Sequence, residues 1–261
     1  MAQAKFSDFT FDSASPEAIR IARRVAANLV VEVSDETRAA IRQAIVNAVS
    51  RKQAPIQAAR EIIGVLVRDG ARAGGVAGLT RRDARAVRNF REELQNAGLS
   101  DTHVKAQTRR FAEKKLKDRA STIARTETMN ALNAGQDAAW KQQQKKGLLG
   151  KNAQKEWIVT PDDRLCQICA PLDGETVPIA KNFSVGVPNP PAHPRCRCAH
   201  GISDPFSNPK RETSIDVQER LSREGAPGAD PDFRATDFRD KKDIPQPPPF
   251  GATRRPPGGS G

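Results

Sequence analysis

Four cysteines and two histidines gather between residues 166 and 200, and these side chains are ligands for a soft or borderline metal ion. Cys166 and Cys169 form a Cys-x-x-Cys pair, and Cys196 and Cys198 follow after a gap of 26 residues. His193 precedes Cys196 by three residues, which repeats the spacing of the first pair. Two turns of this kind can converge on one tetrahedral ion. We therefore predict a zinc site, whose simplest ligand set is Cys166, Cys169, His193 and Cys196.

The sequence leaves alternatives open at this site. Cys198 competes for the fourth position, and the four cysteines alone would also complete a tetrahedron. A structural Zn²⁺ is favoured over a catalytic one, because a catalytic zinc keeps an open position and needs a nearby general base. Reduced structural cysteines and redox or disulfide chemistry are the competing interpretations. No secretory signal is visible at the N-terminus, so we expect the protein to fold in a reducing cytosol, where its cysteines stay as thiols.

The segment around these residues is too small to fold on apolar burial alone. Residues 157–202 are rich in proline and contain few large apolar side chains. Two short strands are predicted, over Lys155–Thr160 and Thr176–Ile179. A structural zinc can contribute about 10 kcal/mol or more to such a fold. After residue 202 the composition becomes Pro- and Gly-rich and charged, so we expect a disordered tail over 203–261.

The chain before this lobe has helical periodicity. Helices are predicted after Ser15 and Ser34, and over about 55–67, followed by a glycine-rich connection. Two more are predicted after Thr80 and Ser100, and a long one over about 121–145. The expected fold is mainly α, with a small α+β zinc-stabilised C-terminal lobe and a disordered Pro/Gly-rich tail. The expected divisions of the chain are 1–79, 80–118, 119–202 and 203–261.

The charge of the chain favours a polyanionic partner. The net charge is +12, and the stretch from Arg81 to Arg119 holds 12 Lys or Arg against 6 Asp or Glu. This excess suits DNA, bound without sequence preference, or an acidic protein surface; the alternative is a solvated helix face. Scarce aromatic residues argue against a base-stacking single-strand binder, and no apolar run is long enough for a membrane span. The candidate contact residues are Arg81, Arg82, Arg85, Arg88, Arg109, Arg110, Lys114 and Lys115.

The predicted helix 121–145 carries an unusually polar stripe. Arg125, Glu127 and Asn133 are predicted to form a structural polar network that bonds backbone or loop groups of the lobe, because buried polar groups need partners. A catalytic pair is the alternative, but no nucleophile or second carboxylate is placed near Arg125 and Glu127. We therefore expect no catalytic residue and no enzymatic activity.

An ordered series of motifs resembles a known family. The series reads Ile123-Ala-Arg-Thr-Glu127, Asn133-Ala-Gly135, Trp140, Lys155-Glu-Trp157, Asp162-Asp-Arg-Leu-Cys-Gln-Ile-Cys169, Leu172-Asp-Gly174 and Pro190-Pro-Ala-His-Pro-Arg-Cys-Arg-Cys198. In this order it is similar to the Mu F-like phage head morphogenesis family of minor head proteins. The resemblance covers about residues 119–201.

The resemblance implies a low-copy virion protein in the interior of the head near the portal, made in the host cytoplasm. Its expected partners are the portal protein, other head proteins and DNA, with a role in head assembly, DNA packaging or ejection. No small-molecule substrate and no membrane are expected. The competing hypotheses are a zinc-containing nucleic-acid-binding protein and a zinc-dependent nuclease. The first lacks a two-Cys, two-His finger spacing, and the second lacks a His-Glu-x-x-His motif.

Overall fold

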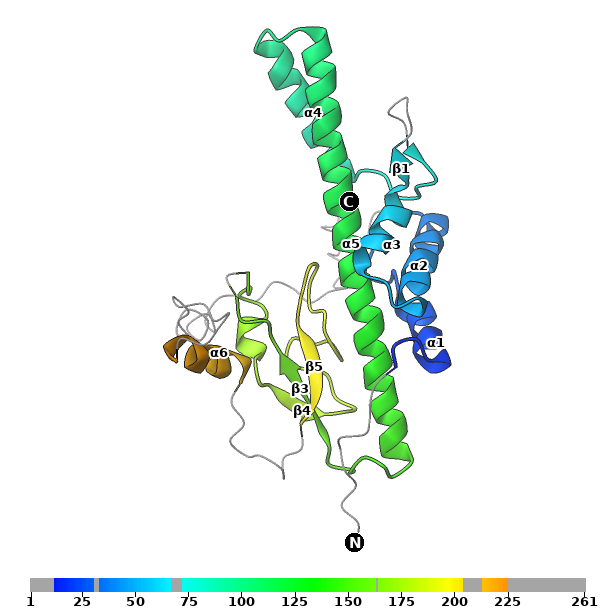
Figure 1. Ribbon diagram of the computed structural model, residues 1–261, viewed down its shortest axis with the longest axis vertical. Coiled ribbons are helices and arrows are strands. Elements are labelled where there is room, and N and C mark those ends of the chain that lie inside the picture. The colour runs from blue at the N-terminus through cyan, green and yellow to red at the C-terminus, as the bar shows by residue number, and fades with distance from the viewer. Residues whose placement is uncertain (1–11, 31–32, 67–71, 163, 204–212, 225–261) are drawn as a thin grey trace, which may run out of the picture. The chain divides into compact units, whose positions relative to one another are not determined.

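The structure, a computed structural model, describes residues 12–30, 33–66, 72–162, 164–203 and 213–224. The chain divides into two compact units. Residues 12–132 form what we call the helical unit, and residues 133–261 together with 1–11 form the lobe unit. One helix, α5 (Asp101–Lys145), contributes to both units (Figure 1). The fold is mainly helical with a small sheet, as predicted.

Three helices form the body of the helical unit: α1 (Pro16–Val25), α2 (Asp35–Ser50) and α3 (Pro55–Ile63). The caps predicted for the first two are confirmed, because the Ser15 hydroxyl accepts a bond from the Ala18 N–H and the Ser34 hydroxyl from the Thr37 N–H. Helix α3 ends earlier than the predicted 67, because Gly64 takes a φ of 71° there. A two-stranded sheet follows, with β1 (Val65–Leu66) antiparallel to β2 (Arg72–Ala73).

Small and branched apolar residues fill the core between these helices and α5. Ile41, Ile45 and Ile62 are fully buried in it, together with Ala120 and Ala124 of α5. Small side chains on the α5 face let helix backbones approach closely and pack at high density. The helical unit therefore has an apolar core of its own.

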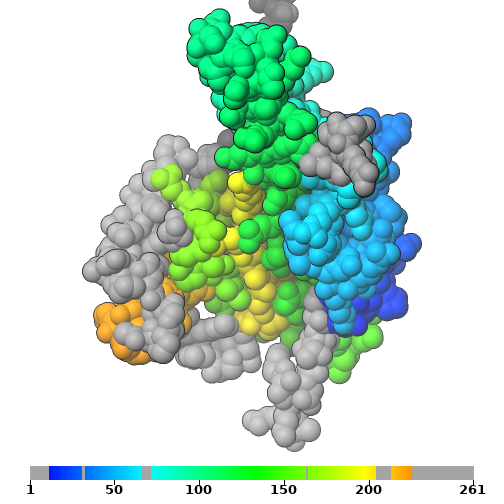
Figure 2. Space-filling model, turned by 45° about the horizontal axis from the view of Figure 1, so that its top comes forward, coloured from blue at the N-terminus to red at the C-terminus, as the bar shows by residue number. Residues whose placement is uncertain are grey.

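The remaining helix of this unit, α4 (Arg81–Asn96), lies back along the first part of α5 and makes a helical hairpin (Figure 1). Thr80 caps α4 as predicted, through a bond from the Asp83 N–H. The rings of Phe90 and Phe111 lie 4.6 Å apart between the two helices. No residue of α4 is fully buried, and Figure 2 shows the hairpin end as an uncovered surface. Most of the hairpin is therefore available for contacts with other molecules.

Helix α5 corrects one prediction. Two helices were expected, one after Ser100 and one from about Ser121, but the 45 residues of α5 form a single helix. No glycine or proline occurs between residues 101 and 134 to break it. Ser121, where the second helix was expected to begin, is an exposed residue inside the helix, and its neighbour Ala120 is buried in the core of the helical unit. No described helix has the length and apolarity that a membrane span requires.

The lobe unit is built on a three-stranded antiparallel sheet in the order β4-β3-β5. Strands β3 (Gln154–Ile158) and β4 (Thr176–Pro178) lie where the sequence predicted them. Strand β5 (Ala199–Ser203) was not predicted, because it contains one β-branched residue and two residues of low strand propensity. It pairs with β3 in a register that places Trp157 opposite His200 and Ile158 opposite Ala199.

Helix α6 (Ser214–Arg223) corrects the expectation of a disordered tail for this segment. Thr213 and Asp216 form a reciprocal capping box at its start. Ile215 is buried in the core of the lobe, and its N–H donates to the Asp173 carboxylate at 2.7 Å. Composition alone hid this helix, since one anchoring apolar side chain and a cap are enough to dock it. The rest of the predicted tail lies outside the described residues.

Candidate metal centre

The sheet of the lobe unit brings the two cysteine pairs to one place. Cys166 and Cys169 follow the end of β3, and Cys196 and Cys198 precede the start of β5. Because β3 and β5 are antiparallel neighbours, the end of one lies beside the start of the other. Residues that are far apart in the sequence are thereby placed side by side.

All five predicted ligand residues lie in this cluster. The Nε2 atom of His193 is 3.0 Å from the Sγ atom of Cys166 and 3.1 Å from that of Cys169. The Sγ atoms of Cys169 and Cys196 are 3.7 Å apart. The donors form two groups of three whose ligand atoms lie within 4.8 Å of one another: Cys166, Cys169 and His193, and Cys169, Cys196 and Cys198. Cys169 belongs to both groups and is therefore the centre of the cluster.

The donor set fits a zinc ion. Two thiolates bound tetrahedrally at about 2.3 Å from zinc lie about 3.8 Å apart, close to the observed separation of Cys169 and Cys196. All four cysteines are free thiols. The Nδ1 atom of His193 is 2.8 Å from the carbonyl oxygen of Pro194, so the ring is oriented with Nε2 toward the sulfurs. Such a bond on the second ring nitrogen is common for metal-binding histidines.

Close packing of the donors perturbs their protonation. Hydrogen bonds from Cys169 and His193 lower the pKa of Cys166 to about 4, and a bond from Cys169 lowers the pKa of Cys196 as well. The same contacts raise the pKa of Cys169. Burial opposes the charged form of His193, but its bonds to Cys166 and Cys196 raise its pKa to about 10. The cluster therefore combines sulfurs that ionise readily with groups that hold their protons.

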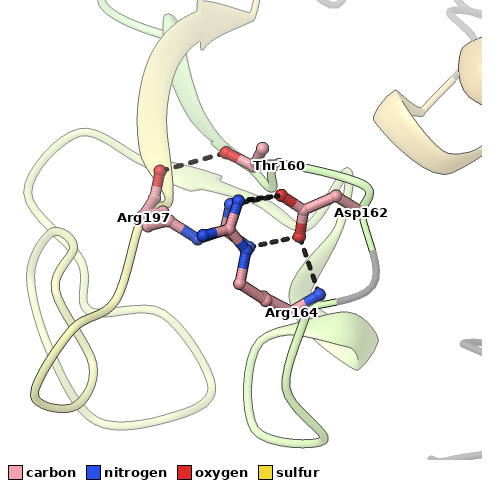
Figure 3. A network of polar contacts seen from close by, with 4 residues as sticks. All are labelled: Thr160, Asp162, Arg164 and Arg197. Atoms are coloured by element: carbon pink, nitrogen blue, oxygen red, sulfur yellow. Dashed lines mark hydrogen bonds and ion pairs between the residues drawn. The ribbon is translucent and has the colours of Figure 1, made fainter. Parts of the chain in front are cut away.

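An ion pair lies next to the cluster. The guanidinium group of Arg197 donates to both carboxylate oxygens of Asp162, and the Thr160 hydroxyl donates to the Arg197 carbonyl at 3.3 Å (Figure 3). The Arg164 N–H also donates to Asp162, at 2.9 Å. The bond from Arg197 lowers the pKa of the Asp162 carboxyl group. Thr160, Arg164 and Arg197 line the same pocket as the metal-ligand candidates.

Aromatic residues pack in the same apolar core as the cysteines of the cluster. Trp157 is fully buried in the same apolar core as Cys169, Cys196 and Cys198, and its ring meets that of Phe183 edge to face at 5.0 Å. His200 is in neither metal-binding group. It is buried against Trp140, with ring centroids 4.7 Å apart in an edge-to-face contact.

A second polar site lies inside the lobe unit. The Nζ atom of Lys155 is fully buried, 3.1 Å from the Asp137 carboxylate and 2.5 Å from the Pro188 carbonyl oxygen. The Asn133 amide donates to the Pro190 carbonyl at 3.0 Å. Both interactions tie α5 to the loop 188–190. Asp137 lies within the predicted helix 121–145, but the sequence does not predict the burial of Lys155, because a lysine in a short strand usually faces solvent.

The three residues predicted as one polar network lie apart. Glu127 is buried in the helical unit, where its carboxylate accepts from the Leu29 N–H at 3.0 Å, while Asn133 bonds within the lobe unit. Arg125 is exposed. Burial raises the pKa of Glu127 to about 7, although the bond from Leu29 opposes this. The expectation that Glu127 bonds the lobe is thus corrected: it holds the loop after α1.

The basic residues named from the sequence line the helical hairpin. Lys115 is half-buried, with its Nζ atom 3.8 Å from Asp83 and 5.4 Å from the centre of the Phe111 ring. The other seven are exposed, namely Arg81, Arg82, Arg85, Arg88, Arg109, Arg110 and Lys114. Their positive charge is therefore directed mainly into solvent.

A family model described as Phage Mu protein F like protein matches residues 89–200. The match begins in α4, covers all of α5 and ends in β5, so it includes every residue of both candidate metal-binding groups. No curated protein and no solved structure shows significant similarity to the chain. Helix α6 and the three helices of the body lie outside the matched range. The resemblance read from the motifs is confirmed: residues 89–200 of the chain match the family described as Phage Mu protein F like protein.

Proposed function

We propose that this protein is a structural component of a phage head that acts in head morphogenesis. The match of residues 89–200 to the Mu F-like family is the observation that carries the proposal. A structural rather than enzymatic role agrees with the composition of the candidate site, because both metal-binding groups consist of cysteine and histidine alone. Asp162, four residues before Cys166, is engaged by Arg197 and is poorly suited to act as a general base. No described feature favours the zinc-dependent nuclease.

The metal in this proposal is one structural zinc. It would take four of the five donors Cys166, Cys169, His193, Cys196 and Cys198, with Cys169 in every set because it is shared by both groups. Zinc would cross-link the segment after β3 to the segment before β5. That link supplies folding free energy to a lobe whose apolar core is small. The bound ion would thus keep the lobe in one shape during assembly and in the particle.

The helical hairpin is the proposed contact surface for the portal protein or DNA. Support comes from the seven exposed arginine and lysine residues on it and from the absence of buried residues in α4. A surface of this charge attracts phosphates or acidic side chains without sequence preference. In this arrangement the lobe is a rigid module, and the hairpin provides the docking charge near the portal.

The virion role is tested in purified particles. Quantitative mass spectrometry should find the chain at a low, constant copy number in intact heads, and deletion of its gene should reduce the yield of DNA-filled heads. Particles that assemble, fill with DNA and infect normally without the protein would refute the role.

The metal is tested separately, on the full chain. Chelation or the variant Cys166→Ser should disorder the lobe while most helical circular dichroism remains, since the helical unit has its own core. Both tryptophans, Trp140 and Trp157, lie in the lobe unit and the chain has no tyrosine, so intrinsic fluorescence reports the lobe alone. Gln167→Ser, an exposed change between the two cysteines, is the matched control. Unchanged fluorescence after complete chelation would contradict the structural zinc.

A further inference from the structure

The ion pair of Asp162 and Arg197 joins the two segments that carry the metal ligands, and it uses no ligand atom. Asp162 lies four residues before Cys166, and Arg197 lies between Cys196 and Cys198. The two terminal nitrogens of the guanidinium group each donate to a different oxygen of the carboxylate (Figure 3). A bidentate pair of this kind fixes direction as well as distance.

The pair continues the link that the sheet begins. Ile158 and Ala199 are the last partners of the β3–β5 ladder on this side. Beyond them, the Thr160 hydroxyl bonds the Arg197 carbonyl, and the Asp162–Arg197 pair follows. The side chain of Arg197 is 17% exposed and that of Asp162 30%, so water screens the pair less than a surface ion pair. The two ligand-bearing segments are therefore held together at three successive points.

We propose that Asp162 and Arg197 are positioning residues, which hold the two halves of the metal site in register before the ion binds. This inference rests on the proposed zinc site. Without this pair, the residues between the end of the β3–β5 ladder and the ligands would be less restrained, and the metal would have to order them when it binds. With the link in place, more of that ordering is complete in advance, and binding becomes tighter because less freedom is lost. Partners that orient metal ligands typically change metal affinity by about 10–100-fold.

The test is zinc affinity of the full chain, measured by competition with a chromophoric chelator. Asp162→Asn and Arg197→Gln should each weaken zinc binding about 10–100-fold. Both should keep a stoichiometry of one zinc and the tetrahedral absorption spectrum of bound Co²⁺, because no ligand has been removed. The double variant should bind about as weakly as the weaker single variant, since either change breaks the same pair. Arg197→Lys keeps the charge but loses the bidentate contact, so it should also weaken zinc binding. It takes the place of another single variant in the test if that variant does not fold.

Glu175→Gln is the matched control. Glu175 is in the same lobe, and its carboxylate accepts bonds from the N–H and hydroxyl of Ser184, away from the metal-ligand candidates. It should keep the wild-type zinc affinity. Equal zinc affinity in Asp162→Asn and the wild type, equal weakening in the control, or additive losses in the double variant would overturn the positioning role and leave the zinc site intact. A wild-type chain that binds no zinc would overturn the metal site and this inference together.

Discussion

Removal of the Asp137 charge should destabilise the lobe unit more than any surface change in it. Lys155 is 0% exposed and Asp137 7% exposed, so their charges depend on each other rather than on water. In Asp137→Asn, the Lys155 ammonium keeps only the Pro188 carbonyl among its described hydrogen bonds. Removing one member of a buried pair typically costs about 3–5 kcal/mol, because the other charge is left uncompensated.

The cost should depend on pH in a defined direction. Burial already lowers the pKa of Lys155, and the Asp137 charge is the main influence that raises it. In Asp137→Asn the folded-state pKa falls further, so between that lowered pKa and about pH 10.4 the unfolded chain binds more protons than the folded chain. The free energy of unfolding of this variant therefore rises as pH increases, and its deficit should be smaller at pH 9 than at pH 6.

Urea unfolding followed by tryptophan fluorescence measures this cost, because both tryptophans lie in the lobe unit. With a slope of about 2 kcal/mol per molar urea, the midpoint should fall by about 1.5–2.5 M. Lys141→Met is the control: Lys141 also contacts Asp137, at 2.6 Å, but is 42% exposed, and its loss should cost at most about 0.5 kcal/mol.

The double variant Asp137→Asn with Lys155→Met tests whether the loss of stability comes from lost contacts or from an uncompensated buried charge. It should recover at least half of the stability lost by Asp137→Asn, since no buried ammonium remains. A loss below about 1 kcal/mol in the single variant, or a double variant less stable than the single one, would refute the reasoning.

Two further changes test other parts of the fold. The pKa of Glu127 is raised from 4.5 to about 7, so between pH 4.5 and 7 the folded chain holds a proton that the unfolded chain has lost. The free energy of unfolding should therefore fall by about 3 kcal/mol as the pH rises from 4.5 through 7. Glu127→Gln should remove this slope, measured as the difference from the wild type in urea unfolding followed by circular dichroism; parallel curves would contradict it. Ile215→Ala should lower the free energy of unfolding of the lobe by about 2–5 kcal/mol and accelerate proteolysis within α6. The exposed change Arg223→Ala should do neither. Equal protease resistance in Ile215→Ala and the wild type would show that Ile215 does not anchor α6.

The sequence was sufficient to predict a feature wherever the interactions that form it join residues close together in the chain. A serine or threonine before an apolar periodicity predicts a helix start because its hydroxyl reaches an N–H three residues on, and Ser15, Ser34 and Thr80 all cap as predicted. The candidate metal ligands were also readable, since Cys-x-x-Cys and His-x-x-Cys spacings place two donors in one turn. The sequence alone therefore predicted the candidate ligand residues, the three helix starts and the resemblance to the family that residues 89–200 match.

Tertiary structure decided everything that depends on partners far away in the sequence. Asp162 and Arg197 lie in two separate motifs, and only the β3–β5 register places them together. Lys155 resembles a surface lysine until α5 brings Asp137 beside it. Ile215 looks like an isolated apolar residue in a polar tail, but the apolar core of the lobe gives it a place to bury. The physical reason is the same in each case. Ion pairing, burial and docking are interactions between segments that are distant in the sequence, and the spacing of residues along one segment carries no information about them.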